Sequence, residues 1–171
     1  MDRAMLDRYI TGWLTRTLPP DKEAQAHAEW NTRGVALLPL GVRFSVVRLP
    51  EHLVHAALGT TDPDEVATRL TERLDGPVIH DTYSVGHPYY PLIQWHAGVV
   101  WESSEDAPCL GEGTYMGVPH ISRTSPPGTH WLVPPRREGD LCQPEAVQRL
   151  IQHARAALAD GLADRPRKVW T

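Results

Sequence analysis

The chain has few lysines and lacks a positive net charge. Of its 17 basic residues only Lys22 and Lys168 are lysines, so its basic chemistry is almost entirely guanidinium, which suits planar contacts to phosphate or carboxylate. The net charge of -4 removes the simplest electrostatic reason to expect non-specific nucleic-acid binding, because such binding depends on Lys and Arg neutralising phosphates. Any contact with nucleic acid is therefore expected to be local.

Long apolar runs are also missing. The longest, residues 35–40 and 44–49, are far shorter than the roughly 20 residues that a membrane-spanning helix needs. The first residues lead into an amphipathic pattern instead of a basic region followed by an apolar stretch, so no secretory signal is expected. We therefore expect no membrane association and a cytoplasmic location, with Cys109 and Cys142 as free thiols.

What is present is typical of one folded domain. The length of 171 residues suffices to bury a core, and hydrophobic residues at 41% and charged residues at 22% are close to globular averages. We expect a helical segment at residues 1–33, an α+β core at 34–140, and a C-terminal helix with a short basic tail at 141–171.

Four stretches have the pattern of helices. An apolar stripe from Met5 to Leu14 predicts a first helix that ends before Pro19, and Asp21 is expected to cap a second that runs through Trp30. This pair either packs on the sheet or forms a partner-binding arm. The sequence 62–65, Asp-Pro-Asp-Glu, predicts a helix that starts with Asp62 as cap and stops at 76–77, Gly-Pro. A last helix is expected from Pro144 to Gly161, and a short one over 51–58.

Short strands are predicted between and after these helices. Residues 35–40 and 44–49 read as two strands joined by a tight turn at Leu40 and Gly41, and 77–80, 89–95 and 98–101 as three more. Two apolar stretches, 111–119 and 129–135, are expected at the centre of the sheet. The order of elements predicts a single α+β domain whose sheet is mixed but mostly antiparallel, with helices packed on it.

The sequence also contains candidate zinc ligands and candidate nucleophiles. Zinc ligands are available in the half expected to form the sheet: His80, Asp81, His87, His96, Cys109, His120 and His130. None of them shows a paired short spacing, which favours histidines at loops and strand ends instead. Ser84, Ser125 or Cys109 would serve as a nucleophile only with a partner base, and the sequence has no Gly-x-Ser-x-Gly turn.

A binding role has more support from residue types. Arginines fall at predicted strand ends or adjacent loops: Arg43, Arg48, Arg123, Arg136 and Arg137. Aromatic residues lie on the predicted strands: Tyr89, Tyr90, Trp95, Trp101, Tyr115 and Trp131. Aromatic rings on a sheet stack on bases while flanking arginines hold phosphates, although alternation assigns about half of these rings to the core. Tyr83 and Tyr115 are the preferred exposed candidates.

A set of ordered motifs carries a family resemblance. These are Leu-Leu-Pro at 37–39, Phe-Ser-Val-Val-Arg-Leu-Pro-Glu at 44–51, Gly-Pro-Val at 76–78, Tyr-Tyr-Pro-Leu at 89–92, Gly-Glu-Gly-Thr-Tyr-Met-Gly-Val-Pro at 111–119 and Trp-Leu-Val-Pro-Pro at 131–135. Their order resembles short actinobacterial proteins related to the N-terminal domain of bifunctional DNA primase-polymerases, in the archaeo-eukaryotic primase group. The resemblance implies an RNA-recognition-like α+β core that, in active members, binds nucleotides and template with divalent metals.

The resemblance also implies where metal ligands would lie. Active members carry an acidic pair at the end of a strand, a histidine after a small-residue turn, and a third acidic residue on a later strand. Here the first strand ends Arg48-Leu-Pro50, and Pro108 stands near the third acidic position. His87 aligns with the histidine if one residue is skipped, and Glu112 remains as a polar residue of the signature strand. The residues expected at a ligand site are Arg43, Arg48, His87, Glu112 and Tyr115.

Three functions follow as hypotheses. The first is a catalytically inactive primase-polymerase-like module, with a binding or regulatory role toward a nucleotide, nucleic acid or protein partner. The second is a divergent metal-dependent nucleotidyltransferase or hydrolase that uses His87 and recruits Asp81, Asp106 or Glu112 to hold Mg²⁺ or Mn²⁺. The third is a structural interaction protein whose N-terminal helix docks on a partner through Tyr9 and Trp13.

Overall fold

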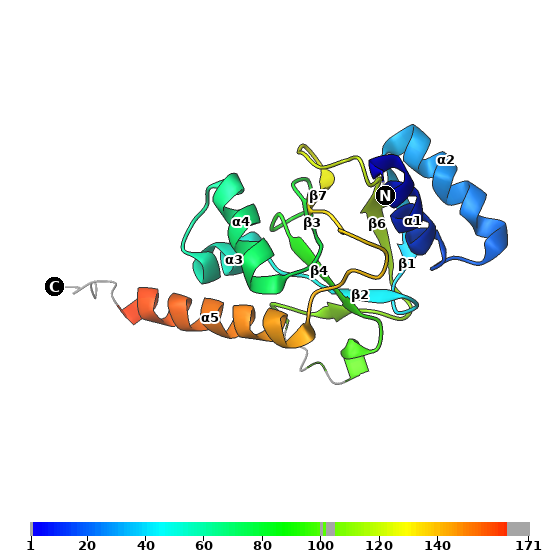
Figure 1. The fold of residues 1–171 in the computed structure, drawn as a ribbon. Coiled ribbons are helices and arrows are strands. Elements are labelled where there is room, and N and C mark those ends of the chain that lie inside the picture. Colours follow the sequence, from blue (N-terminus) through cyan, green and yellow to red (C-terminus); the bar gives the residue numbers. More distant parts are fainter. Residues whose placement is uncertain (1, 100, 102–104, 164–171) are drawn as a thin grey trace.

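Helices cover both faces of an antiparallel sheet in this α+β chain. The computed structural model describes residues 2–99, 101 and 105–163. Figure 1 shows α1 and α2 beside β1 and β6 at one end of the domain, with α3, α4 and α5 at the other end. The strands lie between these two groups of helices.

The N-terminal segment contains two helices, of which the first has a side-chain cap at its start and the second has none. α1 spans Arg3–Thr15, and Asp2 caps it by accepting a hydrogen bond from the Met5 N–H at 2.9 Å. α2 spans Glu23–Arg33, so the prediction that Asp21 caps it was wrong, because residues 20–22 form a 3-10 turn and Lys22 takes the cap position. α2 also runs past the predicted end at Trp30, because it stops only where Gly34 adopts a left-handed backbone with φ of 74°.

The strands form two sheets. The larger has five strands in the order β5-β2-β4-β3-β7, and the smaller pairs β1 with β6. The bounds are β1 Val35–Pro39, β2 Phe44–Val47, β3 Val78–Asp81, β4 Tyr89–Gln94, β5 Cys109–Leu110, β6 Tyr115–Pro119 and β7 Thr129–Val133. Each pairing between these described strands is antiparallel, so the mixed sheet expected from the sequence is not formed.

The arrangement of the strands corrects two further predictions. The strands expected at the centre lie elsewhere, because β6 pairs with β1 in the small sheet and β7 is an edge strand, while β4 is central. β1 and β2 are joined by a turn as predicted but belong to different sheets. The Leu40 N–H donates to the Thr114 carbonyl at 2.8 Å, and the Gly41 backbone packs on Glu112, so the chain leaves one sheet and enters the other at this turn.

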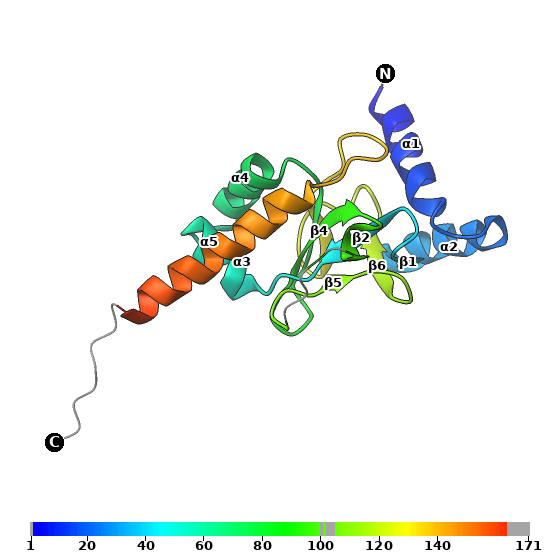
Figure 2. The same ribbon diagram turned by 90° about the horizontal axis from the view of Figure 1, so that it is seen from below.

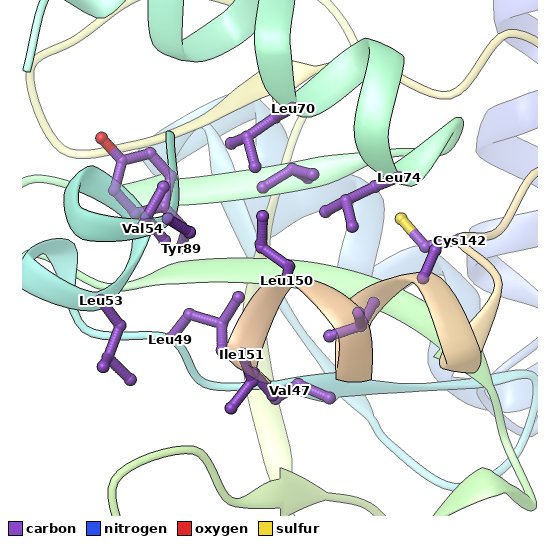
Figure 3. Close-up of a cluster of buried hydrophobic side chains, with 14 of the residues drawn as sticks. Val47, Leu49, Leu53, Val54, Leu70, Leu74, Tyr89, Cys142, Leu150 and Ile151 are labelled. Carbon is purple, nitrogen blue, oxygen red and sulfur yellow. The ribbon is translucent and has the colours of Figure 1, made fainter. Parts of the chain in front are cut away.

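Three helices cover one face of the five-stranded sheet. They are α3 (Glu51–Leu58), α4 (Pro63–Leu74) and α5 (Pro144–Ala163). α5 lies alongside the other two, as Figure 2 shows from below. Their apolar stripes pack on the sheet in one core. Leu70, Leu74, Leu150 and Ile151 of the helices belong to the same buried cluster as Val47 of β2 (Figure 3). This burial supplies the hydrophobic stabilisation of that face.

The local helix signals were confirmed in position but not in every detail. α4 begins at Pro63 with Asp62 at the cap position as predicted, although the Asp62 side chain makes no capping hydrogen bond. α5 begins at Pro144 but continues through Gly161, which was expected to end it. A glycine in a helix costs roughly 1 kcal/mol relative to alanine and does not by itself stop the helix.

A second core lies on the opposite face of the sheet. Ile10, Trp13 and Leu14 of α1 pack with Trp30 of α2 in one cluster, together with residues of both sheets. The sheet residues in it include Phe44, Val46, Ile79, Leu92 and Trp131. Alternation along β4 divides its side chains between the cores, since Tyr89 and Ile93 belong to the first, and Leu92 to the second.

Three remaining predictions can be compared with the structure. The strand expected at 98–101 is wrong, because residues 97–99 form a 3-10 turn and residue 100 lies outside the described residues. Cys109 and Cys142 are both free, as expected. Among the described helices none combines the length and the apolar character that a membrane crossing requires.

Candidate functional site

Arg48 lies at the point where three segments meet. It follows the last residue of β2, and its backbone N–H donates to the Pro108 carbonyl at 3.0 Å. Its guanidinium Nη2 donates to the Val85 carbonyl at 2.6 Å, in the loop between β3 and β4. These are the three segments in which the resemblance locates metal ligands and the histidine of active members. The fold brings these three segments together, with Arg48 at one position and Pro108 near another at which the resemblance implies an acidic residue.

The loop that carries His87 is held in an unusual backbone conformation. Gly86 has φ of 80° and His87 has φ of 40°, a left-handed region that costs a non-glycine residue roughly 1–2 kcal/mol. The His87 N–H donates to the Ser84 carbonyl at 3.0 Å, and its carbonyl accepts from His80 Nε2 at 3.2 Å. Its Nδ1 lies 3.4 Å from Glu51 Oε2 in the first turn of α3. Left-handed residues held in this way cluster at functional sites.

Asp81 fixes the start of the same loop. Its carboxylate accepts from the backbone N–H of Tyr83 at 2.9 Å and of Ser84 at 3.3 Å, and from Ser84 Oγ at 2.5 Å. Burial raises the pKa of Asp81, but these hydrogen bonds and the neighbouring His80 lower the pKa by more than burial raises it. The net shift of the pKa is therefore downward. Asp81 is therefore an ionised acceptor that holds the loop, and its oxygens are engaged by loop donors.

A cavity of about 250 Å³ lies between this loop and β6. Asp81, Ser84, Tyr90, Tyr115 and Thr129 are among the residues that line it. We call it the Arg48–Tyr90 pocket because Arg48, which is not itself a lining residue, interacts with the lining residue Tyr90. Burial raises the pKa of the Tyr90 hydroxyl, and a hydrogen bond from the Arg48 guanidinium opposes that rise. The volume is below the roughly 300–1,000 Å³ of drug-sized sites.

Two of the expected ligand residues lie away from this pocket. Arg43 precedes β2 and Arg48 follows it, so about five strand residues, or roughly 16 Å, separate their backbones. The Glu112 backbone packs against Gly41, at the Arg43 end of β2. Arg48 thus contacts the β3–β4 loop, His87 belongs to that loop, and Tyr115 lines the cavity beside it, whereas Arg43 and Glu112 lie at the other end of β2.

The acidic residues proposed as metal ligands are also dispersed. Asp106 pairs with Arg155 of α5, with Oδ1 3.0 Å from Nη2, whereas Asp81 is the last residue of β3. His80 and His130 are neighbours, with ring centroids 5.4 Å apart. Within the described residues, however, no group of three His, Cys, Asp or Glu side chains is arranged to hold a metal ion.

Tyr90 is the site residue that sequence reasoning did not single out. It was counted among the strand aromatics, while Tyr83 and Tyr115 were preferred. Tyr83 is exposed at the loop tip and Tyr115 is 63% exposed at the pocket rim. Alternation along β4 was the available signal, because it turns Tyr89 toward α3 and Tyr90 toward the opposite face.

Comparisons with protein-family models, with curated proteins and with solved structures found no match to this chain. The candidate site therefore rests on the chain's own residues and their geometry.

Proposed function

We propose that this chain is a catalytically inactive primase-polymerase-like module that binds a nucleotide at the Arg48–Tyr90 pocket. The observation that carries the proposal is the position of Arg48, whose guanidinium donates to the Val85 carbonyl of the His87 loop and opposes the rise in the pKa of Tyr90, which lines the pocket. A guanidinium beside a pocket lined by tyrosines combines a phosphate-binding group with surfaces on which a base stacks.

The order of the strands supports the primase-polymerase part of the proposal. β2 leads through α3 and α4 to β3, β3 forms a hairpin with β4, and β5 returns to the outer edge of β2. The resulting order β5-β2-β4-β3 is that of a split β-α-β sheet of the RNA-recognition type. β7 extends this sheet beyond β3, and β6, which pairs with β1, adds the second wall of the pocket.

The identity of the residues at the three meeting segments supports an inactive assignment. Nucleotidyl transfer needs carboxylates that hold Mg²⁺ or Mn²⁺ against the triphosphate oxygens. Where the resemblance implies acidic residues, the chain has Arg48 at one position and Pro108 near another, and the Arg48 N–H donates to the Pro108 carbonyl. A fixed positive charge at this point repels a divalent cation but attracts the phosphate itself. We assign to Arg48 the neutralising role that the metal has in active members.

The proposal is tested by titrating the full-length chain with ATP and dATP in a calorimeter, with and without Mg²⁺. Binding should not require the metal, and Arg48→Ala should weaken it by about 10- to 100-fold, the value of a charge-assisted hydrogen bond. Arg149→Ala is the matched control, because Arg149 is an exposed arginine on α5. Absence of nucleotide binding by the folded wild-type chain would contradict the proposal.

A primer-extension assay tests the inactive assignment separately. We expect no incorporation of nucleotides with either Mg²⁺ or Mn²⁺. Incorporation that is abolished by His87→Ala would show an active enzyme and overturn this part of the proposal.

A further inference from the structure

We infer that a second concave surface, between the end of α2 and the β6–β7 connection, binds a phosphate group. Its volume of about 500 Å³ is within the usual range of small-molecule sites. Asn31, Gly34, His120, Arg123 and Thr124 are among the residues that line it, and we call it the Arg123 bowl. It shares no lining residue with the Arg48–Tyr90 pocket, and the inference does not depend on the function proposed for that pocket.

Arg123 is positioned in advance of any ligand. Its Nη1 donates to the Arg33 carbonyl at 3.2 Å, and its Nη2 donates to the Pro127 carbonyl at 3.3 Å. In the described part of the chain these bonds use two of its five N–H groups, which leaves three for a ligand. A guanidinium that is already ordered loses less conformational entropy when it binds.

Glycines make the space in which this guanidinium lies. Gly34 and Gly128 both have positive φ, of 74° and 85°. A Cβ at Gly34 would overlap Nη1 of Arg123, and one at Gly128 would lie 3.4 Å from Nη2. The guanidinium therefore fits between two backbone turns that only glycine forms without strain.

His120 adds a second donor of defined tautomer. Its Nδ1 accepts the Ser122 backbone N–H at 3.2 Å and lies 2.7 Å from Ser122 Oγ. Because the backbone amide is always a donor, Nδ1 must be the acceptor, and the neutral ring carries its proton on Nε2. The imidazole is thus fixed as a donor at its remaining nitrogen, while its ring packs edge-on against Trp30.

The charge of the lining selects an anion. The residues that line the bowl supply a guanidinium, an imidazole, an amide and several hydroxyl groups, and none of them is acidic. By contrast Asp81 lines the Arg48–Tyr90 pocket, and Glu29 lines a groove along α2. In a chain of net charge -4, an acid-free concave surface around a fixed arginine favours a negatively charged group.

A phosphate fits these donors better than a carboxylate does. A phosphomonoester offers three strong acceptor oxygens and nearly two negative charges, so it satisfies donors that converge from several sides. A carboxylate has two oxygens in one plane, which match the fork of a single guanidinium. Here the fork is partly occupied by the two backbone carbonyls, and the other donors lie around it.

The test is a titration of the ¹⁵N-labelled full-length chain with sodium phosphate at constant ionic strength, followed by amide chemical shifts. We expect saturable shifts in residues 31–34 and 120–128, with a Kd on the order of 1 mM. Arg123→Gln should weaken binding at least about tenfold. Sodium acetate should produce shifts that do not saturate. AMP distinguishes the two sources of the phosphate: tighter binding of AMP than of phosphate indicates a phosphorylated ligand, and weaker binding indicates free phosphate.

A matched pair of variants keeps the inference testable if Arg123→Gln disturbs the loop. Thr124→Glu places a negative charge in the bowl without removing either Arg123 hydrogen bond, and it should weaken phosphate binding at least about threefold. Thr124→Gln has the same size without the charge and should bind as the wild type does. Equal binding by the two variants would overturn the inference, as would shifts of equal affinity with acetate.

Arg48→Ala separates this site from the nucleotide pocket. Phosphate shifts in residues 120–128 should persist in that variant. If they disappear, the phosphate shifts of the wild type arise from the Arg48–Tyr90 pocket and the Arg123 bowl is not a site.

Discussion

His80 is a residue whose protonation is strongly affected by the fold. Its ring stacks on Tyr89 with centroids 3.9 Å apart, and His130 meets it edge-on. Burial and the neighbouring His130 lower the pKa of His80 from 6.5 to about 4, although the His87 carbonyl and Glu51 oppose the shift. His80 is therefore neutral in the folded chain at neutral pH.

This environment predicts a loss of stability in mild acid. Below its usual pKa of 6.5, the unfolded chain protonates His80 while the folded chain does not until about pH 4. More protons are bound by the unfolded state in this window, so the free energy of unfolding should fall as the pH drops from 6.5 to 4. The slope is at most about 1.4 kcal/mol per pH unit for one proton, and less here because His80 is partly accessible.

Urea unfolding at a series of pH values measures this effect. His80→Gln retains a donor for the His87 carbonyl but cannot titrate, so its stability should depend less on pH than that of the wild type. His52→Gln, at an exposed position of α3, should leave the pH dependence unchanged. The lowered pKa values of Asp81 and Asp140 act below the Asp reference value of 3.8, so a drop confined to that lower range would contradict the role of His80.

At the scale of elements, Arg136 joins the end of α4 to the segment that leads into α5. Its Nε lies 3.0 Å from Asp140 Oδ2, and its Nη1 lies 2.8 Å from Asp75 Oδ1. Asp75 ends α4 with a left-handed φ of 49°, and its carbonyl accepts from Arg136 Nη2. The Asp140 side chain is only 1% exposed, so its charge depends on this partner.

Removal of Arg136 should be more damaging than removal of its neighbour. Arg136→Ala leaves the Asp140 carboxylate buried without its bidentate partner and should lower the free energy of unfolding by about 2–3 kcal/mol. Arg137→Ala is the control, because Arg137 approaches Asp140 only to 3.8 Å and is 65% exposed. Its effect should be below about 1 kcal/mol, as for other exposed ion pairs.

A double mutant identifies the cause of that loss. In the Arg136→Ala/Asp140→Ala chain no carboxylate is buried, so part of the lost stability should return relative to Arg136→Ala alone. Chemical unfolding of Arg136→Ala, Asp140→Ala and the double mutant at neutral pH measures the coupling. Additive losses would mean that Arg136 acts through its contacts to Asp75 and not through Asp140.

At the scale of the whole molecule, the five-stranded sheet separates two cores, and the N-terminal helices cover one of them. Trp13 is 8% exposed and its ring lies 5.6 Å from that of Phe44, whereas Tyr9 on the same helix is 50% exposed. α1 thus uses its apolar stripe to cover the sheet. A partner that docks on this helix would meet Tyr9 and not Trp13.

This division predicts opposite results for the two aromatic residues of α1. Trp13→Ala should cost about 3–5 kcal/mol, as for other large-to-small substitutions in a core. Tyr9→Ala should change the free energy of unfolding by less than about 1 kcal/mol, because an exposed substitution removes little packing. Chemical unfolding of both variants measures the difference, and equal losses would mean that α1 is not docked as described.

Neighbouring residues define most of the local elements. The Asp-Pro start of α4, the Pro start of α5 and the turn residues that bound β3 and β4 placed the starts of these elements within about a residue. The ordered motifs also led to Arg48 and His87 as ligand residues, and that role stays a prediction. Neighbouring residues did not predict where α2 and α5 end. Gly34 ends α2 in a left-handed conformation, whereas α5 continues through Gly161.

Only the tertiary structure decided which strands pair and which side chains meet. β1 pairs with β6, some 80 residues later in the chain, and β4 occupies the centre of the large sheet. Alternation shows that a strand has two faces but carries no information about its neighbour, which is selected by the packing of both cores together. The same long-range packing brings Arg48 to Val85, Tyr90 and Pro108 and leaves Arg43 and Glu112 at the far end of β2.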